Sequence, residues 1–225
     1  NDLVISLLSG GGSSLLTDIP EGCSLKDMME VSDLLINSGA CISEINAVRK
    51  HLSVVKGGQL ARIINPATLV NLILSDVPGD PFDVIASGPT VPDQTTFHQA
   101  LTVLETFGLT RTVPCGILNF LKEGASGKRP ETPKPGDPVF DKTFNILVGS
   151  NRMALEAAKS KALEFNINAV IIDDQLQGDV STVAEYLVET SIRFKSDNNE
   201  VKPVCLLFGG ETTVKITGRG TGGRN

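Results

Sequence analysis

The sequence predicts an α/β protein with a mostly parallel sheet that helices cover on both faces. One observation is that short apolar runs alternate with segments whose apolar residues recur at helical spacing. Another is that the short runs are apolar on both of their faces, which is typical of strands buried between helices. The predicted strands are Leu3 to Leu8, Leu69 to Leu74, Phe144 to Val148, Ala169 to Ile172 and Val204 to Phe208.

The predicted helices follow capping residues. Ser24 is a suitable N-cap for a helix from Leu25 to Asn37, and Ser43 is a suitable N-cap for the next helix. In that second helix we expect the apolar residues to face inward, and Arg49 and Lys50 to face outward. Further helices are predicted at residues 60–64, 96–107, 114–121, 151–165 and 180–195.

Two stretches indicate how the chain is divided. Residues 124–142 contain four prolines and three glycines, which predicts a mobile loop. Near the end of the chain, a break at Gly209-Gly210 separates two strand-like runs, which suggests antiparallel pairing. We therefore expect one domain over residues 1–196 and the beginning of a smaller α/β domain over residues 203–225. Because the chain starts with Asn1 and ends in a glycine-rich loop, we also expect it to be part of a longer protein.

Composition excludes several classes of function. A net charge of −6 argues against a nucleic-acid groove, which needs a basic face. No apolar run approaches the roughly 20 residues that span a bilayer. The four cysteines are far apart, so we expect free thiols in a reducing compartment, namely the cytoplasm, with a mitochondrial location left open. The only histidines, His51 and His98, are expected at surface or half-buried helix positions rather than in catalysis.

Asp76 directly follows the apolar run that ends at Leu74, and ligands bind at the carboxyl ends of strands in such sheets. The loop after it is rich in proline and glycine and carries two more acids, Asp80 and Asp83. Such a loop can hold a metal or orient a hydroxyl group. The alternative is a plain turn in which Asp76 caps backbone amides, and from this stretch alone the turn is the preferred interpretation.

A glycine-rich turn, Ser9-Gly10-Gly11-Gly12-Ser13, follows the first predicted strand. Consecutive glycines let backbone N–H groups approach an anion closely. A tight strand-to-helix turn is the alternative, but three glycines exceed what a turn needs, so we favour an anion cradle. The turn matches neither the G-x-x-x-x-G-K-[ST] motif nor the G-x-G-x-x-G motif.

Basic residues occur in two further places. Arg49, Lys50, Lys56 and Arg62 form a cluster that could face a phosphate, although a solvated helix face is the preferred interpretation. The terminal loop carries arginines, including Arg224, and guanidinium groups suit phosphoryl oxygens. Anion cradles, an acidic strand end and an arginine, without a nucleophile–base pair, together indicate phosphoryl transfer.

Several ordered stretches resemble the type-2 glycerate kinase family, whose C-terminal part is the MOFRL domain. They follow the order of the family over the whole chain, and as a set they are highly specific. The stretches are Leu8 to Leu15, Glu44 to Ser53, Lys56 to Gly58, Leu74 to Asp80, Val84 to Pro89, Gly209 to Thr212 and Gly222 to Asn225.

The resemblance implies an ATP- and Mg²⁺-dependent kinase that converts D-glycerate to 2-phosphoglycerate. It implies a Rossmann-like N-terminal domain, and a catalytic aspartate and arginine that fall on Asp76 and Arg224. The catalytic lysine of the family belongs to an upstream segment that this chain lacks. Asp76 is implied either to orient or deprotonate the glycerate hydroxyl or to hold Mg²⁺, for which Asp80 is a second candidate. Phosphate or carboxylate binding is implied at Ser9, Gly10, Gly11, Gly12, Ser13 and Lys56.

Two alternatives from other classes stay open. One is an NAD(P)-dependent hydroxypyruvate or tartronate reductase, although no G-x-G-x-x-G motif opens a βαβ unit here. The other is a non-catalytic module that binds a nucleotide or an organic acid.

Overall fold

The computed structural model describes residues 2–197 and 203–214. The chain divides into two compact units. The first comprises Asn1–Ile73 and Pro81–Val148, and the second comprises Leu74–Asp80 and Gly149–Asn225. The predicted domain boundary between residues 196 and 203 falls inside the second unit and stays a prediction.

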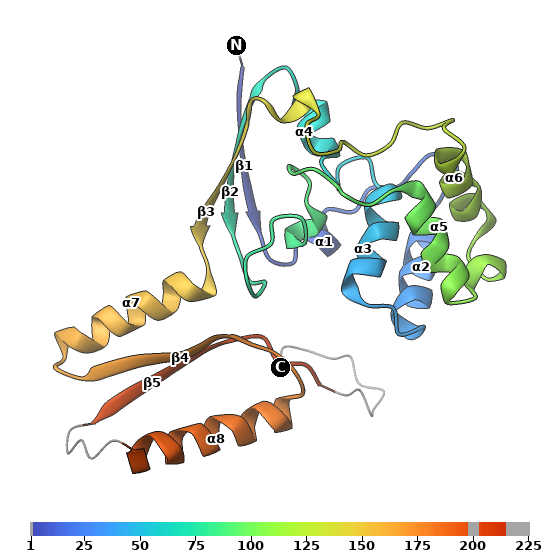
Figure 1. The fold of residues 1–225 in the computed structure, drawn as a ribbon. Helices are drawn as coiled ribbons and strands as arrows, with labels where there is room; N and C mark the ends of the chain where they lie inside the picture. The colour runs from blue at the N-terminus through green and yellow to red at the C-terminus, as the bar shows by residue number, and fades with distance from the viewer. Residues whose placement is uncertain (1, 198–202, 215–225) are drawn as a thin grey trace. The chain divides into compact units, whose positions relative to one another are not determined.

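The sheet of the first unit has three strands, β1 (Leu3–Ser9), β2 (Thr68–Leu74) and β3 (Thr143–Gly149), in the order β1-β2-β3. Figure 1 shows the three arrows pointing in the same direction. Along the central strand β2, buried residues alternate with more exposed ones, because successive side chains point to opposite faces of a sheet. The predicted α/β class with mostly parallel strands is confirmed.

Four helices form the main core of the first unit: α2 (Leu25–Asn37), α3 (Ile42–His51), α5 (Phe97–Thr106) and α6 (Cys115–Ala125). Their apolar stripes meet in a cluster that includes Leu35, Leu104 and Ile117, all fully buried. Ser24 caps α2 as predicted, with Asp27 completing a reciprocal capping box. The remaining short helices of this unit are α1 (Gly12–Leu15) and α4 (Gln59–Ile64).

The predicted start of α3 was wrong. The N-cap is Cys41 rather than Ser43, and Ser43 lies inside the helix. The reason is Glu44, whose Oε2 accepts a hydrogen bond of 2.8 Å from the backbone N–H of Cys41. This acid stands three residues after the cap, which is the position of the acidic partner in a capping box.

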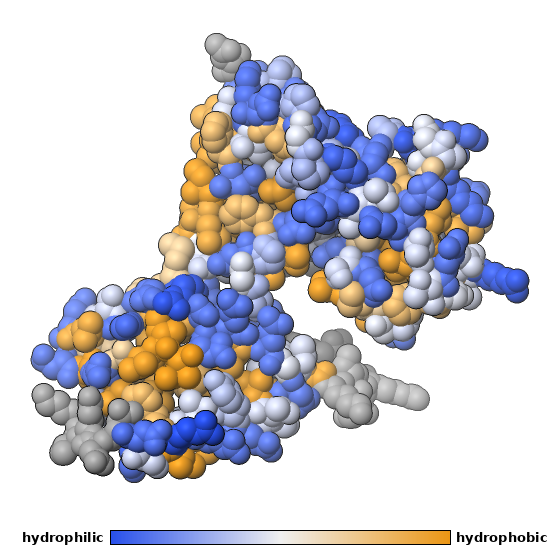
Figure 2. Space-filling view, in the orientation of Figure 1, coloured by the Kyte–Doolittle hydropathy of each residue, from blue (hydrophilic) through white to orange (hydrophobic). Residues whose placement is uncertain are grey.

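One face of the three-stranded sheet exposes apolar side chains. Leu3, Ile5 and Leu7 of β1 and Phe144 and Ile146 of β3 are all exposed, because they occupy alternate positions on that face. Figure 2 shows apolar surface gathered along these strands.

The second unit contains β4 (Asn168–Leu176), β5 (Val204–Gly210), α7 (Asn151–Glu164) and α8 (Val180–Asp197). The two strands pair in parallel, with Asn168 opposite Val204. The antiparallel pairing expected around Gly209-Gly210 is not seen, since residues 211–214 form no strand and Thr213 makes a parallel bridge with Asp179. Figure 1 shows the strand pair between α7 and α8.

The four cysteines are free thiols, as predicted. Within residues 2–197 and 203–214, no helix combines the length and the apolar character that crossing a membrane requires.

Candidate functional site

The glycine-rich turn joins β1 to the short helix α1. Gly11 has φ +78°, a backbone conformation that side chains rarely adopt. A Cβ atom on Gly12 would lie 3.0 Å from the Cβ of Ala86, so a side chain there would crowd the neighbouring chain. Glycine is therefore favoured at both positions for different reasons, and the turn packs closely against the segment around Ala86.

That segment is a 3₁₀ turn, Ile85–Ser87, with an uncommon backbone. Ala86 and Ser87 have φ values of 50° and 62°, although neither is glycine. Non-glycine residues in this region are strained, and such strain clusters at functional sites. Two backbone hydrogen bonds hold the turn, from Gly57 N–H to the carbonyl of Ser87 (3.0 Å) and from Gly58 N–H to that of Gly88 (2.7 Å).

Three polar side chains from separate segments meet at this turn. The hydroxyl of Ser87 donates to Asn46 Oδ1 of α3 at 3.2 Å. The hydroxyl of Ser13, from the glycine-rich turn, lies 3.1 Å from that of Ser87 and donates to it, because the proton of Ser87 is already used. We call Ser13, Asn46 and Ser87 the hydroxyl cluster.

Lys56 directly precedes Gly57, whose N–H donates to the carbonyl of Ser87 in this cluster. Lys56 is only 6% exposed. Its Nζ donates to the carbonyl of Leu16 at 2.6 Å and lies 3.6 Å from Oδ1 of Asp18. Burial lowers the pKa of Lys56, Asp18 opposes this change, and the positive charge of Arg49 lowers the pKa further. The predicted residues Ser13 and Lys56 thus lie at opposite ends of the short helix α1: Ser13 is in its first turn, and Lys56 contacts Leu16 just after its C-terminal end.

The expectation that the basic cluster forms a solvated helix face was wrong. Lys50 is 4% exposed and Lys56 is buried, and neither faces solvent. The reason is that buried acids compensate their charges: Nζ of Lys50 lies 3.4 Å from Oδ1 of Asp93. Arg62 donates to the backbone carbonyl of Glu131 at 2.8 Å.

His51 was also expected to be more exposed than it is. The side chain is 1% exposed, whereas His98 is exposed. Nδ1 lies 2.7 Å from the carbonyl of Ala47, and Nε2 lies 2.8 Å from Oε1 of Glu131. Both neighbours are hydrogen-bond acceptors, and the position of the ring proton decides which nitrogen donates. Asp93 Oδ2 lies 3.9 Å from Nε2 and adds a second carboxylate.

The segment after α6, predicted as a loop, provides part of this network. Glu131 receives the hydrogen bond from His51, and Thr132 Oγ1 donates to Asp93 Oδ2 at 3.0 Å. Lys134 Nζ contacts the carbonyl of Thr95. We call His51, Lys50, Asp93, Glu131 and Thr132 the buried ion network, and it fastens the loop to the C-terminal end of α3.

The pKa of Glu131 makes part of this network sensitive to acid. Burial alone would raise it, but hydrogen bonds from His51 and from the N–H groups of Phe97 and Thr132 outweigh burial and lower it from 4.5 to about 2. A carboxyl group with a lowered pKa stabilises the fold fully when the pH is above its ordinary pKa of 4.5. This contribution is lost as the pH falls through the folded-state pKa of about 2. We expect the free energy of unfolding, measured with urea, to fall across this window.

Glu131→Gln is expected to be less stable than the wild type above this window and to lose less stability within it. Glu105→Gln, an exposed glutamate of α5, is the matched control and should keep the wild-type pH dependence. An unchanged pH dependence in Glu131→Gln would show that other acids govern it.

Asp76 lies in the second unit, in the loop after β2, and is exposed. Within the described part of the chain its carboxylate has no hydrogen bond or ion pair. The local amide of Val77 is instead bound by the hydroxyl of Ser75, at 3.2 Å. The alternative in which Asp76 caps backbone amides is therefore not what the structure shows.

Asp80 follows in the same loop, with φ 54°, and its N–H donates to the carbonyl of Val77 at 3.0 Å. Asp83 belongs to the first unit, where it lies 4.0 Å from Nζ of Lys50. Arg224 lies outside the described residues. Among residues 2–197 and 203–214, no three His, Cys, Asp or Glu side chains gather in a way that could hold a metal ion.

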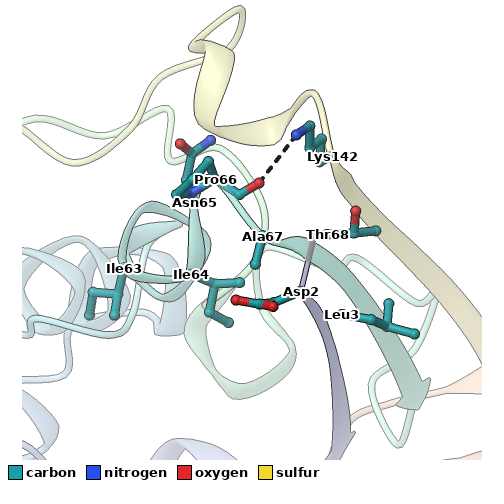
Figure 3. A pocket seen from close by; sticks show the side chains of 9 residues that line it. All are labelled: Asp2, Leu3, Ile63, Ile64, Asn65, Pro66, Ala67, Thr68 and Lys142. Carbon is teal, nitrogen blue, oxygen red and sulfur yellow. Dashed lines mark hydrogen bonds between the residues drawn. The ribbon is translucent and has the colours of Figure 1, made fainter.

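A separate pocket of about 550 Å³ opens in the first unit, and Figure 3 shows it from close by. It contains none of the predicted site residues, and Lys142 Nζ donates there to the carbonyl of Pro66 at 3.3 Å. It lies at the starts of β1 and β2, whereas ligands bind at carboxyl ends in such sheets. Its lining residues are Asp2, Leu3, Ile63, Ile64, Asn65, Pro66, Ala67, Thr68 and Lys142.

Sequence patterns did not point directly to Asn46, Ser87 or the buried ion network. Their partners are far away in the chain; Glu131, for example, comes 80 positions after His51. One available signal was that Lys50 and His51 lie between Val48 and Leu52, two apolar positions that are fully buried.

A parallel sheet with a glycine-rich turn after its first strand, next to helices, defines an α/β domain. Residues 1–122 match the family model described as a domain of unknown function, DUF4147. The chain belongs to this family, whose domain is the N-terminal domain of type-2 glycerate kinases, so the resemblance seen in the sequence motifs is confirmed.

Relatives of known name match the whole chain. A protein named glycerate 2-kinase from Pyrococcus horikoshii is 41% identical, and the match covers 51% of that protein. One named putative hydroxypyruvate reductase from Agrobacterium vitis is also 41% identical, with 50% covered. The crystal structure of a glycerate kinase from Thermotoga maritima has a TM-score of 0.83 and 42% identity over 100% of this chain and 51% of that one. The chain therefore spans about half the length of the relatives it matches.

Proposed function

We propose that this chain is part of a glycerate kinase that transfers the γ-phosphoryl group of ATP to a hydroxyl of D-glycerate, giving 2-phosphoglycerate. The observation that carries the proposal is the similarity over the whole chain to the glycerate 2-kinase of Pyrococcus horikoshii. The residue types also suit it: the first unit has a glycine-rich turn and a buried lysine, and the second has a strand-end carboxylate without a partner among the described residues, and phosphoryl transfer depends on such positioning and charge.

In this proposal Asp76 acts on the substrate hydroxyl or holds Mg²⁺. Its carboxylate is exposed and has no partner among the described residues, so it is available for either task. Mg²⁺ in kinases is commonly held by one or two carboxylates together with phosphate oxygens and water, so Asp76, with or without Asp80, fits as a donor. The bound metal would neutralise phosphate charge. Arg224 is proposed to do the same at the transferring phosphoryl group.

The glycine-rich turn is proposed to bind an anionic group of ATP or glycerate. Gly10, Gly11 and Gly12 carry no side chains, which suits binding through backbone N–H groups. The proposed contacts come from Ser9, Gly10, Gly11, Gly12, Ser13 and Lys56. The expected partners are small molecules, and the expected location is cytoplasmic, which agrees with four free thiols.

A coupled assay on the full-length protein tests this proposal. We expect ATP consumption that depends on D-glycerate and on Mg²⁺, with no change in NAD(P)H. Reduction of hydroxypyruvate with NAD(P)H, without ATP consumption, would instead support the reductase activity that the name of the Agrobacterium vitis relative suggests. Binding of ATP or glycerate without either reaction would indicate a binding module.

A further inference from the structure

Arg49 stands apart from the other cations of its cluster. Lys50 is paired with Asp93, Lys56 contacts a carbonyl and Asp18, and Arg62 donates to the carbonyl of Glu131. Within the described residues, Arg49 has neither a hydrogen bond nor an ion pair, although its side chain is half-buried. Burial lowers its pKa, and no acceptor offsets that burial.

Asn46 offers a second donor without an acceptor. It is 5% exposed, and its Oδ1 accepts from the hydroxyl of Ser87. Its amide nitrogen, Nδ2, therefore remains as a donor, and it has no acceptor among the described residues. Among the described residues, Asn71 Oδ1 is the only fully buried side-chain polar atom without a hydrogen-bond partner, so Nδ2 of Asn46 keeps some exposure and is accessible to a ligand.

The two donors lie close together on the same helix. Arg49 follows Asn46 by three residues in α3, which places the two side chains on one face of the helix. This face meets the hydroxyl cluster, since Asn46 is a member of it. The charge of Arg49 also acts on Lys56, so the guanidinium lies within electrostatic reach of that buried ammonium.

We propose that Arg49 and Asn46 bind the carboxylate of a small hydroxy acid, the class to which D-glycerate belongs, and so determine substrate specificity. This inference rests on the proposed function. A guanidinium presents two parallel N–H donors that match a carboxylate. One unpaired cation balances the single charge of such an acid, whereas a triphosphate carries several charges. The hydroxyls of Ser13 and Ser87 lie beside the same site and can meet the hydroxyl groups of the acid.

The test compares D-glycerate with its uncharged methyl ester in the full-length protein. For Arg49→Gln we expect kcat/KM for glycerate to fall about 10- to 100-fold, the size of a lost charged hydrogen-bond pair, with little change for the ester. Asn46→Asp keeps the acceptor for Ser87 but places a negative charge near the carboxylate, so it should show the same selective loss. Arg49→Lys should restore part of the preference. Arg111→Gln, at an exposed arginine, is the control and should match the wild type.

Calorimetric titration of D-glycerate separates this inference from the proposed function. Weaker binding to Arg49→Gln, with a wild-type circular dichroism spectrum, supports the inference even if no phosphoryl transfer occurs. If the wild type phosphorylates glycerate and Arg49→Gln keeps wild-type affinity and selectivity, the inference is overturned while the function stands. An equal fall in the kcat/KM of Arg49→Gln for D-glycerate and for its methyl ester would also overturn the inference.

Discussion

Replacing Asp76 by asparagine is expected to lower kcat of the full-length protein by about 10³-fold, the effect of losing a group that acts on the reacting hydroxyl. The variant should fold normally, because the carboxylate is exposed and has no partner among the described residues. The measurement is steady-state ATP consumption with D-glycerate, together with the melting temperature.

The Mg²⁺ dependence of Asp76→Asn distinguishes the two proposed roles. If Asp76 holds the metal, a higher Mg²⁺ concentration should restore part of the rate, and Asp80→Asn should raise the Mg²⁺ requirement as well. If Asp76 acts on the hydroxyl, added Mg²⁺ should restore nothing. Asp141→Asn, at another exposed aspartate, is the control. A rate for Asp76→Asn within a few-fold of the wild type would remove Asp76 from the catalytic set.

The largest expected loss of stability comes from Asp93→Ala. Asp93 is fully buried and accepts from Lys50 at 3.4 Å and from Thr132 at 3.0 Å. Removing it leaves the buried ammonium of Lys50 without its nearest acid, which should cost about 3–5 kcal/mol of unfolding free energy. Urea denaturation at neutral pH measures this loss.

The control for Asp93→Ala is Asp33→Ala, on the exposed side of α2, which is expected to change stability by less than about 0.5 kcal/mol. A loss in Asp93→Ala no larger than in this control would mean that the buried ion network does not hold the loop to α3.

Local features of the fold were predictable from sequence. The strand ending at Leu74 and the cap at Ser24 depend on residues that are neighbours in the chain. The glycine-rich turn was predictable for the same reason, because the conformational freedom of Gly11 is a local property. Its use as an anion cradle stays a prediction.

Burial of charge was not predictable, because it depends on distant residues. Helical spacing suggested that Lys50 faces solvent, but an acid 43 residues later in the chain makes its burial tolerable. Asn46 and Ser87 are joined in the same way, across 41 residues. A single sequence records such pairs only as separate polar residues, so the hydroxyl cluster emerged from the structure.

Phosphorus NMR of the full-length protein with ATP, Mg²⁺ and D-glycerate tests the central claim most directly. The account predicts that the γ-phosphate signal of ATP decreases while the signal of 2-phosphoglycerate increases by the same amount. An ATP spectrum that stays unchanged, or that yields only inorganic phosphate, would contradict it.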